Sequence, residues 1–206
     1  MTIFTFNEQQ SIGEVRSVET SRITIRVTDG QRLQKARVGR LVAIQATGDE
    51  WLIGIVERVW RHPVELPTLD EGEVAEGAAA IQQEENGVAI SLVGTYRARD
   101  GQRHNTFSRA VFALPEINRP VYPIEEKSLE DFMGILSASS KADAATPLKV
   151  GTYTLDGKAS AYIDGDKLFQ RHAALLGSTG SGKSFTVASI LEQTAQLPHA
   201  NVVVLD

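Results

Sequence analysis

The sequence predicts a small β-barrel or sandwich followed by the beginning of an α/β domain. Three observations lead to this prediction. Residues 12–114 carry short segments of alternating apolar and polar residues with turn signals between them, the pattern of half-buried strands. Residues 115–147 are punctuated by prolines. After residue 148, an apolar run, a glycine-rich loop and an amphipathic segment follow in the order of a strand, a loop and a helix.

The composition is that of an ordinary soluble protein. The chain has 206 residues, of which 42% are hydrophobic and 23% are charged. It contains no cysteine, which excludes disulfides and thiolate metal sites and fits a cytoplasmic protein. No apolar run is long enough for a membrane span, and the N-terminus lacks the features of a signal peptide. The net charge of -5 counts against a simple DNA-binding domain.

Strands in the first region are predicted by alternation and by breaks. Apolar residues at positions 23, 25 and 27 alternate with polar ones, which places one face against a core. We expect strands at residues 22–28, 41–44, 51–59, 88–93 and 107–114. The pairs Asp29-Gly30, Gly48-Asp49 and Asn86-Gly87 indicate turns, and Asn86-Gly87 is a strong hairpin signal. No helix is expected among these strands, and closing the sheet would remove its exposed edges.

The middle region is predicted to be a linker with one short helix. A helix is expected at residues 128–136, with Ser128 as its N-cap. We therefore divide the chain into a barrel at residues 1–125, a linker at 126–147 and the first part of an α/β domain at 148–206.

The last region is expected to begin a parallel sheet. Two strands at 150–155 and 158–163 are joined at Asp156-Gly157, and an apolar strand follows at 173–176. A helix extends from residue 184 to about residue 196, and Pro198 ends it. Residues 202–205 are the next buried strand.

A phosphate-binding loop lies between the apolar strand and that helix. Residues 177–184, GSTGSGKS, satisfy the pattern G-x-x-x-x-G-K-[ST]. Glycines allow a tightly curved backbone whose N–H groups point at a phosphate, and the helix N-terminus adds its positive end. The expected ligands are ATP and Mg²⁺. Lys183 reaches the β- and γ-phosphates as the catalytic residue, and the Ser184 hydroxyl binds the metal. The assigned site comprises Gly177, Ser178, Thr179, Gly180, Ser181, Gly182, Lys183, Ser184 and Phe185.

Four other residues could suggest a functional role, but we assign none of them to metal binding, catalysis or base stacking. Asp206 ends an apolar run as a Walker B acid does, but it follows Lys183 so closely that we interpret the run as the next strand of the sheet. His172 has no partner carboxylate or serine pattern, and we interpret it as structural. Trp51 and Trp60 are expected to be core or rim residues of the barrel rather than platforms for stacked bases.

Two stretches together resemble HerA-type ATPases. Residues 168–184, LFQRHAALLGSTGSGKS, are similar to the family's approach to its phosphate loop, in which an arginine and a histidine precede the strand. Residues 12–15, 38–42 and 54–59 are similar to the HAS-barrel, which is named for its occurrence in HerA and ATP synthases. The first stretch is specific, and the barrel likeness is weaker. Together they cover most of the chain.

The resemblance implies a RecA-like motor that assembles as a hexameric ring and moves double-stranded DNA through its centre. Such motors act with a partner, which is a NurA-like nuclease in end resection, or another nuclease or a sirtuin-type NAD-consuming enzyme in phage defence. The barrel ring would dock that partner. A Walker B acid, a catalytic glutamate and an arginine finger are not identifiable, so we expect an inactive fragment of a longer protein.

Two alternatives remain open for the whole protein. One is a barrel scaffold that assembles a partner effector and uses nucleotide as a structural ligand. The other is an unrelated P-loop protein, such as a rotary ATPase subunit that shares the barrel. Charge is segregated in the barrel: the basic cluster, Arg32, Lys35, Arg37 and Arg40, is separate from acids concentrated within residues 65–85. These groups either order neighbouring subunits or only promote solubility.

Overall fold

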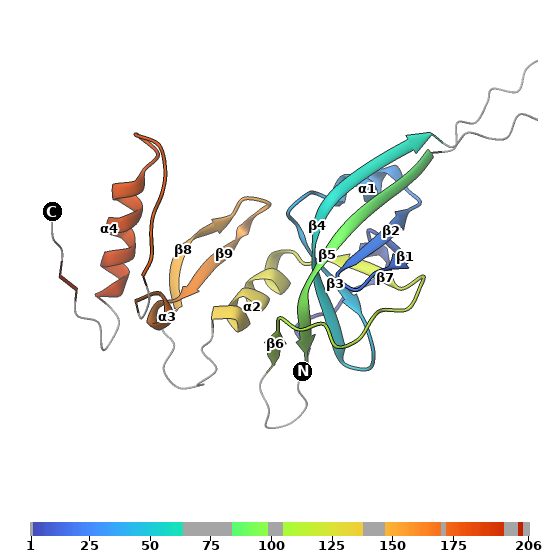
Figure 1. Cartoon of the computed structure of the whole chain (residues 1–206), viewed down its shortest axis with the longest axis horizontal. Coiled ribbons are helices and arrows are strands. Elements are labelled where there is room, and N and C mark those ends of the chain that lie inside the picture. The colour runs from blue at the N-terminus through green and yellow to red at the C-terminus, as the bar shows by residue number, and fades with distance from the viewer. Residues whose placement is uncertain are drawn as a thin grey trace, which may run out of the picture. The chain divides into compact units, whose positions relative to one another are not determined.

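The computed structural model describes residues 2–63, 84–98, 105–137, 147–169, 172–195 and 202–203. The chain divides into two compact units, Met1–Ile124 and Glu125–Asp206. Figure 1 shows strands gathered in the first unit and a hairpin with helices in the second.

The first unit is a closed antiparallel barrel. Its strands are β1 (Gly13–Val18), β2 (Arg22–Val27), β3 (Leu41–Gln45), β4 (Glu50–Pro63), β5 (Glu84–Arg97), β6 (Thr106–Ser108) and β7 (Pro120–Pro123). Six of them pair in the order β2-β1-β7-β3-β4-β5, and pairing of β5 with β2 closes the ring. β6 adds to β5 outside the ring. The predicted barrel is confirmed, and closure leaves its six strands without a free edge.

Alternation along the strands builds the core of the barrel. On β2, Ile23, Ile25 and Val27 are buried, while Arg22 and Arg26 are exposed, as the period of two predicts. Buried side chains from β1, β3, β4, β5 and β7 join them in one hydrophobic cluster. Burial of this apolar surface is the main force that holds the barrel together.

Aromatic side chains of the N-terminal segment pack onto the barrel. Phe4 contacts Trp51 and Tyr96 edge-on, with ring centroids 5.6 and 4.9 Å apart. Phe6 stacks on Tyr122 at 4.7 Å and also touches Trp51. The segment then enters the short 3₁₀ helix η1 (Glu8–Gln10). Trp51 is therefore a packing residue, as expected from the sequence.

Three predictions for this unit are wrong. Asp29-Gly30 begins a helix, α1 (Gly30–Lys35), in which the Asp29 carboxylate caps Gln31 N–H at 2.8 Å. Asn86 and Gly87 form no hairpin turn, because both lie inside β5 and pair with β4. The strand expected at 107–114 is reduced to β6, since residues 109–114 join no ladder.

The second unit contains a helix, a hairpin and the phosphate-loop helix. Its elements are α2 (Glu126–Ser137), β8 (Pro147–Tyr153), β9 (Asp156–Asp164), α3 (Gly165–Phe169) and α4 (Lys183–Thr194). β8 and β9 pair antiparallel, and Tyr153 faces Asp156 across the turn. The turn therefore lies at residues 154–155 and not at Asp156-Gly157, which already belong to β9. The predicted helix before Pro198 is confirmed as α4.

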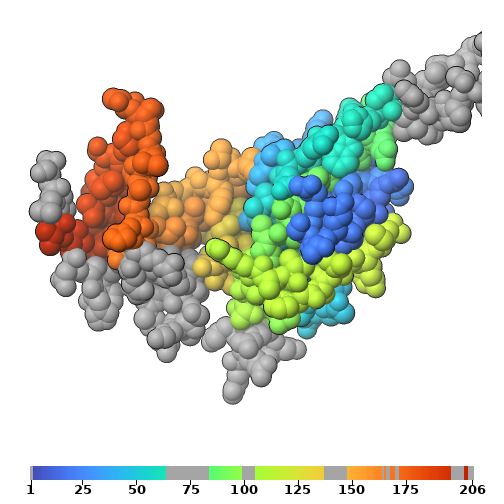
Figure 2. Space-filling model, in the orientation of Figure 1, coloured from blue at the N-terminus to red at the C-terminus, as the bar shows by residue number. Residues whose placement is uncertain are grey.

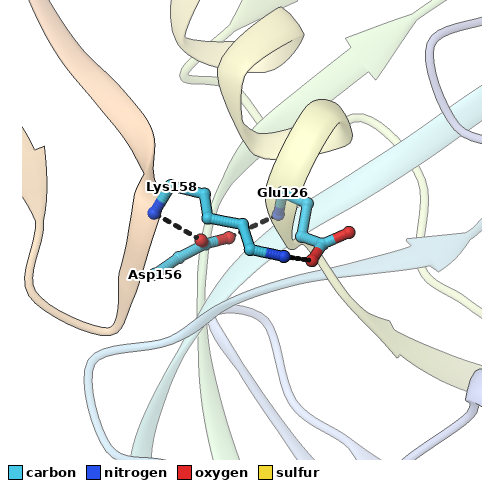
Figure 3. Close-up of polar contacts among 3 residues, drawn as sticks. All are labelled: Glu126, Asp156 and Lys158. Carbon is cyan, nitrogen blue, oxygen red and sulfur yellow. Dashed lines mark hydrogen bonds and ion pairs between the residues drawn. The ribbon is translucent and has the colours of Figure 1, made fainter.

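The start of α2 is capped by the hairpin. Ser128 lies inside α2, so its predicted N-cap role is wrong. Instead the Asp156 carboxylate accepts hydrogen bonds from the backbone N–H groups of Glu126 and Lys158. The Lys158 ammonium also donates to the Glu126 carboxylate at 2.7 Å. Figure 3 shows these three side chains, which we call the α2 clasp.

The expected parallel sheet is not formed in the described residues. Residues 173–176 join no strand ladder, and Leu176 is 90% exposed. Val202 and Val203 also lie outside any strand, while residues 204–206 lie outside the described part. A strand of a parallel sheet is defined by its hydrogen-bonded neighbours, and none of the described segments pairs with residues 173–176. Among the described residues, no helix is both long and apolar enough to cross a membrane.

Candidate nucleotide-binding site

The loop at residues 177–182 has the backbone conformation that its glycines allow. Gly180 and Gly182 have φ angles of 80° and 85°, in the left-handed region that disfavours a side chain. A Cβ built on either residue would find no atom within 4 Å, so open space faces both positions. At Gly177 the opposite holds, because a Cβ there would lie 2.6 Å from Ser181 Oγ. The loop therefore needs glycine for dihedral angles at two positions and for close approach at a third.

Lys183 folds back over the beginning of the loop. Its ammonium donates hydrogen bonds to the carbonyl oxygens of Gly177 and Ser178, at 2.8 and 2.6 Å. Ser181 N–H also donates to Ser178 O at 3.2 Å, which makes a turn. These bonds hold a positive charge within the loop. A phosphate that enters the loop has to compete with these carbonyl oxygens for the ammonium.

The N-terminus of α4 offers its backbone donors to an anion. Gly182 is the N-cap residue and supplies no side-chain acceptor, and the first turn contains no acid. Thr186 N–H and its hydroxyl both bond to Gly182 O, at 2.9 and 3.0 Å, and so fix the first turn. The first N–H groups of a helix have no acceptor within the helix, and the macrodipole favours negative charge at this end. The phosphates of a nucleotide supply both the acceptors and the charge.

The residues present fit a nucleoside triphosphate with Mg²⁺. The Ser184 side chain is exposed on the first turn of α4, beside Lys183. Mg²⁺ retains several waters and takes phosphate oxygens with few protein ligands, and in phosphate loops one of these ligands is the Ser or Thr hydroxyl. Phe185 is 80% exposed at the same end of the helix. In Figure 2 the orange segment that leads to α4 lies at the surface, where a ligand can reach it.

The structure brings the predicted site residues together in one loop and one helical turn. His172 precedes the loop and is exposed. Asp206 lies outside the described residues, as do Gln170 and Arg171 of the stretch before the loop. Trp60 packs against Gly87 in the barrel and therefore has a structural role.

A comparison with known families identifies this part of the chain. Residues 148–206 match the family described as the central domain of the helicase HerA. The C-terminal part of the chain is thus similar to a segment of HerA-type ATPases. The match begins within β8 and includes the phosphate loop and α4, so all the predicted site residues lie inside it.

The chain is also similar to an uncharacterized protein, aq_aa31, of Aquifex aeolicus (strain VF5). The two are 32% identical over 94 residues, which is 44% of this chain and 33% of the relative. The chain thus spans about a third of the length of the relative that it matches.

One contact in this unit, made by Gln193, could not be found from the sequence. Gln193, near the end of α4, uses its side-chain amide to contact the backbone of Lys149 in β8. Helical periodicity could not find it, because a glutamine on a partly exposed helix face fits the pattern of an ordinary surface residue. Its contact appears only when β8 and α4 are placed together.

Proposed function

We propose that the protein is an ATP-driven double-stranded DNA translocase or helicase of the HerA type, which acts as a hexameric ring with a partner effector. The observation that carries the proposal is the phosphate loop with two left-handed glycines at the uncapped N-terminus of α4, inside the segment that matches HerA. A ring motor needs such a site in each subunit to couple nucleotide turnover to movement.

The loop residues perform binding and charge stabilisation in this proposal. Backbone N–H groups between Gly180 and Ser184 hold the β-phosphate, and Lys183 exchanges its two carbonyl contacts for phosphate oxygens. Mg²⁺, when bound, would neutralise negative charge on the phosphates. The Ser184 hydroxyl would be a ligand of that ion. Lys183 stabilises the negative charge that develops on the transferred group.

The barrel is proposed to build the ring and to dock the partner. Its described residues contain no cluster of three or more His, Asp or Glu side chains suited to a metal. Buried apolar side chains from six strands form the core of the barrel. Its outer surface is therefore what remains for recognition. The expected partners are further copies of this chain and a NurA-like nuclease or a sirtuin-type NAD-consuming enzyme, with double-stranded DNA as the motor substrate.

The decisive experiment uses Lys183→Ala in the complete protein. The variant loses the ammonium that contacts the γ-phosphate, so we expect ATP hydrolysis to fall by at least about 100-fold while the ring still assembles. Phosphate release measures the turnover, and light scattering measures the assembly. Lys127→Ala, which removes an exposed lysine side chain on α2, is the matched control and is expected to hydrolyse ATP normally. Normal turnover by the Lys183 variant would refute the assigned site.

Movement on DNA requires a separate measurement. The wild-type protein is expected to displace a triplex-forming strand from duplex DNA in the presence of ATP, and the Lys183 variant is not. A different result would favour the scaffold hypothesis: a wild-type protein that binds nucleotide and its partner but neither hydrolyses ATP nor displaces the strand.

A further inference from the structure

The side-chain amide of Gln193 binds both backbone groups of one residue in β8. Its Oε1 accepts from Lys149 N–H at 2.7 Å, and its Nε2 donates to Lys149 O at 2.7 Å. A second contact of Nε2, to Ser189 O at 3.3 Å, helps to hold the amide in this orientation. Gln193 thus occupies the place that a residue of a neighbouring strand would take.

Lys149 can be bound in this way because of its position in the hairpin. β8 pairs with β9 on one side, in a two-stranded sheet. In an antiparallel pair, alternate residues direct both backbone groups away from the partner strand. Lys149 directs its two groups toward α4, where Gln193 satisfies them. Only a planar amide offers one donor and one acceptor side by side, so glutamate or lysine cannot make the same pair of bonds.

This contact matters for the orientation of α4. Thr194 is the buried residue of the helix, while Phe185 and Val187 near its other end are 80% and 44% exposed. Apolar packing in the described structure therefore holds the loop end of α4 weakly. Gln193 and Lys183 are ten residues apart in the helix, or about 15 Å along its axis. A helix moves as a rigid rod, so a tilt at Gln193 displaces the N–H groups that face a phosphate.

We propose that Gln193 is a positioning residue for the phosphate-binding loop: it anchors the far end of α4 to Lys149 and so holds the helix N-terminus in the orientation that accepts the β-phosphate of a nucleoside di- or triphosphate. The proposal rests on the nucleotide-binding function given above. Without the anchor, the helix occupies the competent orientation for a smaller fraction of time. The apparent nucleotide affinity then falls in proportion to that fraction.

The test compares Gln193→Met with Glu192→Met in the complete protein. Methionine keeps the length of Gln193 but removes both hydrogen bonds. The control places the same side chain on the adjacent, exposed position of the same turn. We expect the Kd values for ATP and ADP to rise together by about five- to tenfold in Gln193→Met, because the β-phosphate cradle serves both. The KM for ATP should rise by the same factor, while kcat at saturating ATP stays within about twofold, because bound nucleotide restores the orientation.

The outcomes separate this proposal from a purely structural role and from failure of the proposed function. A Gln193→Met variant that melts earlier but binds ATP as tightly as the control would overturn the positioning role. A wild-type protein that binds neither ATP nor ADP would overturn the nucleotide site itself, whatever Gln193 does.

A measurement on the unmodified protein keeps the test valid if Gln193→Met does not fold. Hydrogen exchange at the Lys149 amide reports directly on the anchor. ADP binding is expected to slow that exchange by about tenfold, because nucleotide selects the anchored helix. If ADP slows hydrogen exchange at the loop amides but leaves exchange at the Lys149 amide unchanged, the two ends of α4 are not coupled.

Discussion

Gly87 of β5 lies directly against the indole ring of Trp60, its register partner on β4. A Cβ at position 87 would fall inside contact distance of three ring atoms of Trp60. We therefore expect Gly87→Ala to destabilise the barrel by about 1–3 kcal/mol, because the ring has to leave its place against Gly87. Chemical denaturation followed by tryptophan fluorescence measures the change.

Gly30→Ala is the control within the same unit. A Cβ at Gly30 would make an ordinary contact with the Arg61 side chain at 3.5 Å, and Gly30 opens α1, where alanine is favoured. Its stability is expected to equal or slightly exceed that of the wild type. If both variants are equally stable, then Trp60 has room to move and the close approach does not explain this glycine.

The α2 clasp gives a prediction for the second unit. Asp156 accepts the Glu126 N–H in the first turn of α2, which is the task of an N-cap side chain. Asp156→Ala is therefore expected to cost about 1 kcal/mol of stability, and Asp156→Asn a few tenths, because asparagine retains an acceptor. Thermal unfolding followed by circular dichroism distinguishes them. An alanine variant as stable as the asparagine variant would refute the capping role.

The pH dependence of the clasp follows from Lys158. Its hydrogen bond to Glu126, and then the charge of Glu126, raise the pKa of Lys158 above its ordinary value of 10.5. A raised pKa means that the stabilisation is complete below that value and is lost as pH rises through the pKa of the folded protein. The stability difference between wild type and Lys158→Met should be small and constant from pH 7 to about 10, and should then vanish.

Comparison with Lys158→Met is needed because another group titrates in the same range. Burial raises the pKa of Tyr153, which lies in β8. Its neutral form is favoured in the folded protein, so both proteins lose stability on its account as the solution becomes alkaline. The difference between the two proteins removes this shared effect. A difference that persists well above pH 11 would mean that the charge of Lys158 contributes nothing.

The left-handed glycines of the phosphate loop can be tested against a glycine of the hairpin. Gly182 has a φ of 85°, where alanine is strained by about 1–2 kcal/mol. Gly182→Ala is expected to weaken ATP binding by about 5- to 30-fold, because the strain favours other loop conformations. Gly157, with open space and no positive φ, should tolerate alanine without loss of affinity. Isothermal titration measures both, and equal affinities would contradict the role of loop geometry.

The alternation of β2 and the phosphate loop could be predicted from sequence because each pattern has one physical explanation. Ile23, Ile25 and Val27 share a face only in a strand. Gly180 and Gly182 within their motif indicate a curved loop whatever surrounds it. In both cases the signal lies within a few consecutive residues.

Other features depend on contacts between distant segments and could not be predicted. The dipeptide that contains Gly87 has the sequence of a hairpin turn. Gly87 lies in β5 instead, and its lack of a side chain leaves room for the ring of Trp60 on β4. Asp29 looks like a turn residue and instead caps a helix too short to show periodicity. Asp156 caps a helix that begins 30 residues earlier. The bond from Gln193 to Lys149 spans 44 residues.

The basic cluster of the barrel gives the last prediction, which concerns ring assembly. Arg37 is exposed just after α1. Arg40 differs, because its guanidinium donates to the Lys35 carbonyl at 2.9 Å and so supports the turn into β3. Most of the acidic stretch lies outside the described residues. Its two described members already form ion pairs within the barrel: Glu84 with Arg61 and Glu85 with Arg16. Attraction between subunits would therefore involve Arg37 and the acids at 65–76.

Charge reversal at Arg37 tests this attraction. An exposed ion pair contributes about 0.2–1 kcal/mol, but a ring repeats it at each interface, so Arg37→Glu should shift assembly to higher protein concentration at low salt. The shift should disappear near 0.5 M salt, where charges are screened within about 4–5 Å. Arg26→Glu, on the exposed face of β2, is the control for net charge, and Arg40→Glu should also lower stability because it loses the Lys35 contact. Mass measurement and partner pull-down at both salt concentrations report the result. If Arg37→Glu assembles and binds the partner at low salt as well as Arg26→Glu does, charge does not determine the interface. Apolar contacts of the barrel would then set it.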